Sequence, residues 1–319
     1  MKGSYRIVVQ NAAVRFDFEI KRNITIIKGD SATGKTTLVE MIREHYENGE
    51  SSGIELSCKK SCAVISGKEW AVILSTMKDK IVFIDEGNAF VHSKEFARAV
   101  QQSDNYYVIV TREGLANLPY SVDEIYGIRE SGKYGTLKKT YNEMYHIYGN
   151  SEYGKNTMTA KLIVEDSNAG FEFYESLSDR KGWSVKSANG KSNIFAEILN
   201  NLQTEKILVI ADGAAFGAEM DRIMKLLHNQ DNIMLYLPES FEWLILKSGI
   251  LNDKEIRMIL ENPQDYIESD KYLSWERYFT VLLTEKTEDS YLKYTKKRLN
   301  PAYCQESIQD KICSVMYND

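Results

Sequence analysis

The chain has 319 residues, of which 43% are hydrophobic and 27% are charged, and its formal net charge at pH 7 is −6. The length fits one large domain or two domains of roughly 100–200 residues each, and the negative charge excludes a general electrostatic attraction to nucleic acid. No apolar run approaches the ~20 residues of a transmembrane helix, and the N-terminus shows no signal-peptide core. We therefore expect a cytoplasmic protein with no membrane partner.

Short apolar runs that alternate with helix-length segments predict a first α/β domain over residues 1–145. We expect strands at 7–9, 14–20, 24–27, 54–56, 63–65, 81–84 and 107–110, and helices at 37–46, from about residue 68, and at 93–102. Strands separated by helices imply parallel βαβ units. The continuous apolar run 24–27 is typical of a strand buried within a parallel sheet.

A phosphate-binding loop, Gly-Asp-Ser-Ala-Thr-Gly-Lys-Thr, follows the strand 24–27 directly. In this P-loop pattern the glycines let backbone N–H groups surround the phosphates, Lys35 reaches the β- and γ-phosphate oxygens, and the Thr36 hydroxyl ligates Mg²⁺. The helix that begins there directs its positive end toward the anion. We predict that ATP or GTP binds with Mg²⁺ at Gly29, Asp30, Ser31, Ala32, Thr33, Gly34, Lys35, Thr36 and Thr37. No base-reading motif separates ATP from GTP.

A second nucleotide-site element follows the apolar strand 81–84, which ends in two carboxylates, Asp85 and Glu86. This resembles a Walker B strand, which implies that Asp85 holds Mg²⁺, mostly through water, and that Glu86 polarises the attacking water. Taken alone, the same segment would read as an ordinary strand that ends in two surface acids. Thr111 and Arg112, just after the strand 107–110, form a third candidate element near the γ-phosphate.

The first domain resembles the ATPase heads of ABC and SMC proteins, in which an antiparallel sheet precedes the phosphate loop. The second acid, Glu86, is typical of hydrolytic ATPases of the ABC, SMC and AAA type, whereas kinases of small molecules often lack it. The segment 65–69 faintly resembles the ABC signature, but it lies too close to the loop for a complete helical subdomain. The resemblance implies a compact ATPase core that acts as a homo-oligomer.

A polar segment with two glycines, residues 146–158, separates a second domain from the first. A smaller α/β domain is expected over 159–250 and a helical C-terminal segment over 251–319. The expected strands are 162–164, 207–210 and 233–236, and the expected helices are 169–176, 194–202 and 220–227. The fold class predicted for the whole chain is α/β, a P-loop NTPase sandwich with a parallel sheet followed by this smaller domain.

Three acids follow the predicted strands of the second domain: Glu165, Asp212 and Glu242. Parallel strands that end in acids collect those acids at one edge of the sheet. Clustered carboxylates can hold Mg²⁺ for phosphodiester chemistry. We therefore predict catalytic roles for all three residues and metal ligation by Glu165 and Asp212.

This order of acids resembles the Toprim domain of topoisomerases, primases and the OLD (overcoming lysogenization defect) nucleases. Glu165 matches its first acid, Asp212–Gly217 matches the motif Asp-x-Asp-x-x-Gly, and Glu242 matches a later OLD-like Glu. Three positions depart from the pattern, since Ala169 and Ala214 stand where acids are usual and Asp166 stands where Gly is usual. An ATPase followed by Toprim is the layout of OLD proteins, which implies a role in bacterial anti-phage defence.

Two interpretations of the whole chain remain open. In the first, ATP binding and hydrolysis control a metal-dependent nuclease that acts on nucleic acid. In the second, the protein is an ATP-dependent switch that binds a partner protein through a non-cleaving Toprim-like domain. A small-molecule kinase is a third, weaker interpretation, since Glu86 and the second domain both argue against it.

The segment after residue 250 is aromatic and basic, notably at 274–279 and 291–298. Base stacking combined with phosphate contact is one interpretation of this pattern. Packing of the aromatic side chains between helices and sheet is the interpretation that we favour. The basic run Lys296, Lys297 and Arg298 is read as a solvated surface.

Overall fold

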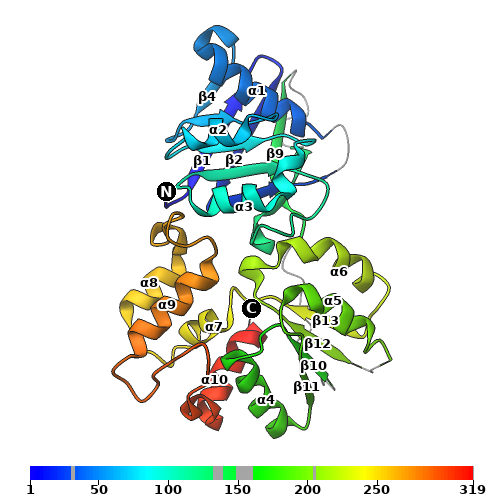
Figure 1. The fold of residues 1–319 in the computed structure, drawn as a ribbon, viewed down its shortest axis with the longest axis vertical. Helices are drawn as coiled ribbons and strands as arrows, with labels where there is room; N and C mark the ends of the chain where they lie inside the picture. The colour runs from blue at the N-terminus through cyan, green and yellow to red at the C-terminus, as the bar shows by residue number, and fades with distance from the viewer. Residues whose placement is uncertain (30–32, 132–138, 149–160, 204–205, 319) are drawn as a thin grey trace. The chain divides into compact units, whose positions relative to one another are not determined.

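The computed structural model describes residues 1–29, 33–131, 139–148, 161–203 and 206–318. The chain divides into two compact units (Figure 1). Unit 1 contains Met1–Gly149 and Asn262–Leu273, and unit 2 contains Asn150–Glu261 and Ser274–Asp319. The segment Asn262–Leu273, which the sequence assigns to the C-terminal helices, therefore belongs to unit 1.

Among the described residues, unit 1 contains a mixed nine-stranded sheet with the order β4-β1-β2-β9-β8-β3-β7-β6-β5. Its strands are β1 (Tyr5–Gln10), β2 (Val14–Ile20), β3 (Ile24–Ile27), β4 (Glu55–Ser57), β5 (Cys62–Val64), β6 (Ile81–Ile84), β7 (Tyr106–Val110), β8 (Ile125–Glu130) and β9 (Thr140–His146). The neighbours from β8 through β5 are parallel, whereas β1 is antiparallel to both β2 and β4. The sheet thus joins a parallel half to a mixed half, in which β9 is antiparallel to β8 but parallel to β2.

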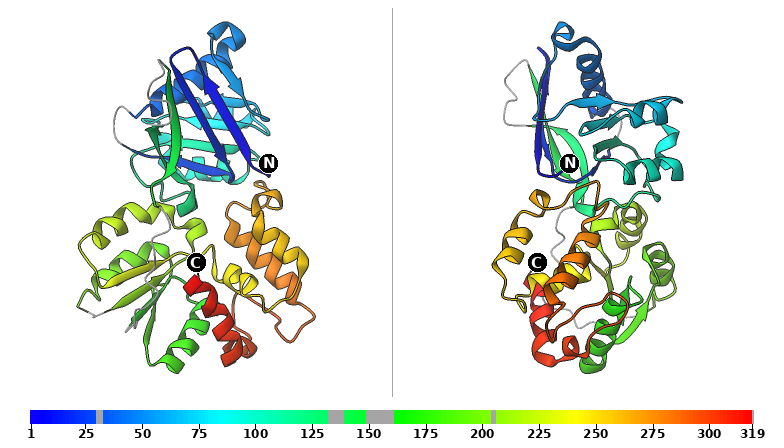
Figure 2. Two further views of the ribbon diagram at one scale, coloured as in Figure 1. Left: turned by 180° about the vertical axis from the view of Figure 1, so that it is seen from behind. Right: turned by 60° about the vertical axis from the view of Figure 1, so that its left-hand side comes forward.

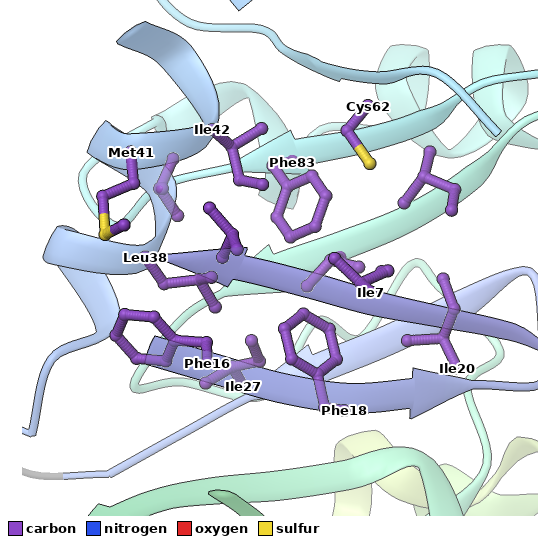
Figure 3. Packing of buried hydrophobic residues seen from close by; sticks show 14 of the residues in the cluster. Ile7, Phe16, Phe18, Ile20, Ile27, Leu38, Met41, Ile42, Cys62 and Phe83 are labelled. Atoms are coloured by element: carbon purple, nitrogen blue, oxygen red, sulfur yellow. The ribbon is translucent and has the colours of Figure 1, made fainter. Parts of the chain in front are cut away.

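The principal helix of unit 1, α1 (Lys35–Asn48), packs on this sheet through one apolar face. Leu38, Met41 and Ile42 are buried at helical spacing, and they belong to one cluster with Ile7 and Phe83 (Figure 3). The other helical segments of the unit are η1 (Gly49–Ser52), α2 (Trp70–Ser75), η2 (Ala89–His92), α3 (Lys94–Gln101), η3 (Val122–Glu124) and η7 (Pro263–Asp265). The burial of α1 fixes the position at which its first turn meets the phosphate loop.

The described part of unit 2 contains a parallel four-stranded sheet with the order β11-β10-β12-β13. Its strands are β10 (Lys161–Val164), β11 (Ser184–Ser187), β12 (Ile207–Ile210) and β13 (Ile233–Tyr236). Its helices are α4 (Ala169–Lys181), α5 (Lys191–Leu199), η5 (Gly213–Ala215), η6 (Gly217–Glu219), α6 (Met220–Leu227), α7 (Phe241–Lys247), α8 (Lys254–Glu261), α9 (Trp275–Thr287), η8 (Pro301–Cys304) and α10 (Glu306–Asn318). Both views of Figure 2 show α8 and α9 side by side.

An α/β architecture is present in both units, as the sequence predicts. The strands 14–20, 24–27, 81–84, 207–210 and 233–236 and the helix 220–227 occur with the predicted bounds. The sequence reasoning missed β8, β9, β11 and α7. The strand β9 pairs with β2 in the sheet. None of its residues is buried, and its side chains are at least partly exposed on both faces. Such a strand lacks the apolar signal on which sequence reasoning depends.

Candidate functional site

The ammonium of Lys35 lies between Gly29 and Thr33, two residues of the predicted phosphate loop. Its Nζ donates to the carbonyl oxygen of Gly29 at 2.9 Å and to Oγ1 of Thr33 at 2.8 Å, and only 5% of the residue is exposed. Lys35 is also the first residue of α1. The predicted contact residues Asp30, Ser31 and Ala32 lie outside the described residues.

Two glycines give the loop a backbone conformation that other residues rarely adopt. Gly29 has φ +133°, and Gly34, which caps α1, has φ +84°. A Cβ atom on Gly29 would lie 3.9 Å from both Lys35 Nζ and Thr33 Oγ1, and would therefore enter the loop. Thr36 and Thr37 are exposed in the first turn of the helix. These features fit a loop that surrounds an anion at the N-terminus of a helix.

The other predicted nucleotide-site residues follow neighbouring parallel strands at the same edge of the sheet. The strand β7 lies between β3 and β6, with Ile27 beside Val110 and Ile84 beside Ile109. The predicted phosphate loop follows β3, Thr111 follows β7, and Asp85 follows β6. These three segments therefore leave the sheet at the same edge. Ligands of open parallel sheets bind beyond the carboxyl ends of the strands.

Hydrogen bonds hold each of these polar groups in place. Thr111 donates its N–H to the carbonyl of Ile27 at 3.1 Å, which extends the pairing of β7 with β3. Asp85 accepts the N–H of Glu86 through Oδ1 at 2.8 Å. The carboxylate Oε1 of Glu86 lies 2.6 Å from Nε of Arg112. A hydroxyl in the first helical turn and a carboxylate directly after a strand are oxygen donors of the type that suits Mg²⁺, so the residue types fit the predicted metal. Within the described residues no group of three or more His, Cys, Asp or Glu side chains is placed to hold a metal ion in this unit.

In unit 2, Glu165 and Asp212 lie together beyond the adjacent strands β10 and β12. The backbone N–H of Asp212 donates to Oε2 of Glu165 at 3.0 Å. The strands are paired directly, with Val164 beside Ile210. The sequence prediction that these two acids share one edge of the sheet agrees with this pairing.

Glu242 occupies a different setting from a strand end. It lies in the first turn of α7, and only 1% of the residue is exposed. Its Oε1 accepts a hydrogen bond from the hydroxyl of Tyr294 at 2.8 Å. Its Oε2 is buried and has no hydrogen-bond partner among the described residues.

Two further charged residues, which sequence reasoning did not select, contact this region. Lys296 donates to the carboxylate of Glu276, in the first turn of α9, and its Nζ lies 3.8 Å from Oε1 of Glu242. Burial alternates along this segment, since Leu292 and Tyr294 are buried whereas their neighbours are exposed. That period of two places Lys296 on the inward side, and it is the signal that could have distinguished this lysine from the solvated Lys297.

We define the acidic cluster as Glu165, Asp212, Glu242 and Glu276. Burial raises the pKa of Glu165 to about 7, although the N–H of Asp212 opposes the rise. Burial also raises the pKa of Asp212 well above its ordinary value, with further contributions from Glu276, Glu165 and Glu242. Both shifts favour the protonated form of these two acids, because burial and neighbouring carboxylates disfavour negative charge.

Positive charge reaches the acidic cluster from two lysines. Burial lowers the pKa of Lys191, whose Nζ donates to the carbonyl of Ala215 at 2.7 Å. Burial opposes ionisation of Lys296 as well, but Glu242 and Glu276 outweigh it and raise the pKa of Lys296 above its ordinary value. Glu242 and Glu276 therefore favour the charged form of Lys296.

The predicted metal site of unit 2 fits this arrangement poorly. No group of three or more His, Cys, Asp or Glu side chains in the described residues is placed to hold one metal ion. Glu165 and Asp212 are neighbours, but Glu242 is bonded to Tyr294 and faces Lys296. As arranged, the three predicted acids do not form a metal centre.

Comparison with known proteins leaves the chain without an assigned family. No protein-family model matches the sequence, and no curated protein matches it at a significant level. Within the described part of the chain, none of the helices combines the length and the apolar character that a bilayer crossing requires.

Proposed function

We propose that the chain is a P-loop ATPase that binds ATP with Mg²⁺ in unit 1 and uses hydrolysis to control unit 2. The observation that carries this proposal is the alignment of three elements at one edge of the sheet. The loop around Lys35, the buried Thr111 and the pair Asp85–Glu86 follow the adjacent parallel strands β3, β7 and β6. Assembly into a homo-oligomer is part of the proposal, as the ABC and SMC resemblance implies.

In this mechanism each residue of unit 1 has a separate role. Lys35, whose ammonium now contacts Gly29 and Thr33, would bind the phosphate oxygens, and Thr36 and Asp85 would hold a metal ion, which would supply positive charge to neutralise the phosphates. Glu86 orients and polarises the attacking water. GTP remains an alternative nucleotide, since no described contact reads the base.

For unit 2, we propose a Toprim-like domain that acts as a partner-binding element of the switch. Two observations favour this function over nucleic-acid cleavage. Ala169 and Ala214, at positions where Toprim domains carry acids, are both buried in this chain. Glu242, the third predicted acid, is bonded to Tyr294 and faces a lysine. A role in anti-phage defence is proposed from the resemblance alone.

Nucleotide binding by the purified protein tests the ATPase proposal. We expect Lys35→Ala to weaken ATP binding at least about 100-fold, because charge-assisted hydrogen bonds contribute about 1.5–3 kcal/mol each. The matched control is Lys94→Ala, which removes an exposed lysine from the first turn of α3. Unchanged ATP affinity in Lys35→Ala, measured by titration calorimetry, would refute the proposed phosphate site.

A cleavage assay separates the two functions of unit 2. Purified protein is incubated with DNA or RNA and Mg²⁺ or Mn²⁺, with and without ATP, beside the variant Asp212→Ala. The switch function predicts ATP hydrolysis without cleavage in either sample. Cleavage that disappears in Asp212→Ala would instead establish the nuclease function.

A further inference from the structure

The ammonium of Lys296 joins two carboxylates that come from different helices. Glu242 lies in the first turn of α7 and Glu276 in the first turn of α9, and these helices pack against each other. Lys296 donates to Glu276, and its Nζ lies 3.8 Å from Oε1 of Glu242. Asp212 belongs to the same region, since it directly precedes η5, which contacts α9.

The chain segment that carries Lys296 is fixed at several points. We call residues 288–300, between α9 and η8, the lysine loop. The carbonyl of Lys296 accepts the N–H of Ala169 at 3.2 Å, and the N–H of Leu299 donates to Glu172 at 2.7 Å. Tyr294, two residues before Lys296, donates its hydroxyl to Glu242. The loop therefore holds the ammonium against the acidic cluster through its backbone.

The carboxylate of Glu242 is almost fully enclosed beside Lys296. It is 1% exposed, and its Oε2 has no hydrogen-bond partner among the described residues. A buried carboxylate without compensating charge costs several kcal/mol. Lys296 supplies a positive charge on the Oε1 side of this group.

We propose that the ammonium of Lys296 is the resident cation of the acidic cluster and takes the place that a divalent metal ion would occupy. Unit 2 consequently binds little Mg²⁺ or Mn²⁺ while the lysine loop is in position. Displacement of Lys296 opens the cluster to a metal ion. The lysine thus determines whether the Toprim-like acids act as a metal centre. This inference concerns unit 2 alone and requires neither nucleotide binding nor ATP hydrolysis.

Two physical requirements support competition between the ammonium and a metal ion. Mg²⁺ needs oxygen ligands at about 2.0–2.1 Å and Ca²⁺ at about 2.3–2.6 Å, so the carboxylates must converge on one point. Lys296 engages Glu242 and Glu276, and among the described residues no group of three or more His, Cys, Asp or Glu side chains is placed to hold a metal ion. An ammonium and a divalent ion that shared these carboxylates would also repel each other strongly at short range.

Metal binding to the full chain tests the inference directly. Mn²⁺ binding is measured by electron paramagnetic resonance without nucleotide, in an Asp85→Asn background that removes the metal ligand proposed for unit 1. We expect Lys296→Met to bind Mn²⁺ at least about tenfold more tightly than its parent, and Lys296→Arg, which keeps the charge, to resemble the parent. Adding Asp212→Asn to Lys296→Met should abolish the gain. Equal or weaker Mn²⁺ binding by Lys296→Met overturns the inference.

If the loss of Lys296 impairs folding, the unfolding temperature with and without Mn²⁺ tests the inference instead. The variant Lys296→Gln retains a polar group beside Glu242 without its charge. If a cation is what the cluster requires, Mn²⁺ should raise the unfolding temperature of Lys296→Gln much more than that of its parent, or restore its circular dichroism. If Lys296 is only a structural ion-pair partner, the variant stays destabilised at every Mn²⁺ concentration, and the inference fails. Neither outcome depends on whether unit 1 hydrolyses ATP.

Discussion

Nε of Arg112 lies 2.6 Å from Oε1 of Glu86 in unit 1. The two residues follow the adjacent parallel strands β7 and β6, one residue beyond Thr111 and Asp85 respectively. The side chain of Arg112 is 58% exposed and that of Glu86 is 36% exposed, so this pair contributes at most about 1 kcal/mol to stability. Glu86 is therefore available for chemistry without being needed for the fold.

Glu86→Gln should separate hydrolysis from binding. We expect the rate of ATP hydrolysis to fall by about 10²–10⁴-fold, the usual contribution of a general base, while ATP affinity and the unfolding temperature stay close to wild type. Steady-state phosphate release and calorimetric titration measure the two effects. The control Glu95→Gln changes an exposed acid in the first turn of α3 and should hydrolyse ATP normally. Full hydrolysis by Glu86→Gln would remove Glu86 from the mechanism.

Gly34→Ala should destabilise unit 1 and also weaken nucleotide binding. The left-handed backbone at φ +84° costs an L-residue roughly 1–2 kcal/mol, and the new Cβ would meet the Phe16 ring at 3.4 Å. Gly53→Ala is the matched control, since Gly53 has φ +71° and open space around its Cα. Urea denaturation should show a similar loss in both variants, whereas only Gly34→Ala should lose ATP affinity. Equal ATP affinity in the two variants would contradict a role of Gly34 in the loop.

Tyr294→Phe should destabilise unit 2, because it removes a hydrogen bond from a buried carboxylate. Hydrogen bonds to charged groups contribute about 1.5–3 kcal/mol, and the hydroxyl of Tyr294 lies 2.8 Å from Glu242. Tyr291→Phe provides a control in the same loop, since Tyr291 is 72% exposed. Chemical denaturation followed by circular dichroism measures both losses. A loss no larger in Tyr294→Phe than in Tyr291→Phe would show that the buried bond contributes little.

Glu165 should make unit 2 less stable as the pH rises. Burial raises the pKa of Glu165 to about 7 from an ordinary value of 4.5, so between these values the folded state keeps a proton that the unfolded chain has released. The resulting stabilisation is fully present below pH 4.5 and is lost as the pH rises through about 7. Urea midpoints at pH 5 and pH 8 should differ less for Glu165→Gln than for wild type. The same pH dependence in both proteins would show that the proton resides elsewhere.

The sequence by itself determined the elements whose signals are local. Continuous apolar runs such as 24–27 and 207–210 form strands with the predicted bounds, because a strand covered on both faces must be apolar throughout. The signal for the phosphate loop is likewise local, since it consists of glycines, a lysine and a helix start, and the loop stays a prediction. The sequence could predict that Glu165 and Asp212 lie at the same edge of the sheet, because Glu165 directly follows the apolar run 162–164 and Asp212 closely follows the run 207–210.

Only the tertiary structure decided which residues surround the acids of unit 2. Glu242 lies in the first turn of a buried helix, and Glu276 and Lys296 reach it from the C-terminal part of the chain. The sequence run that contains Lys296 looks like an ordinary solvated surface, and the Lys296 side chain is indeed 38% exposed, because charge alone does not reveal which lysine pairs with a buried acid. Long-range packing selects one lysine of that run and holds it against Glu242, and the energy of that contact depends on desolvation by residues distant in sequence.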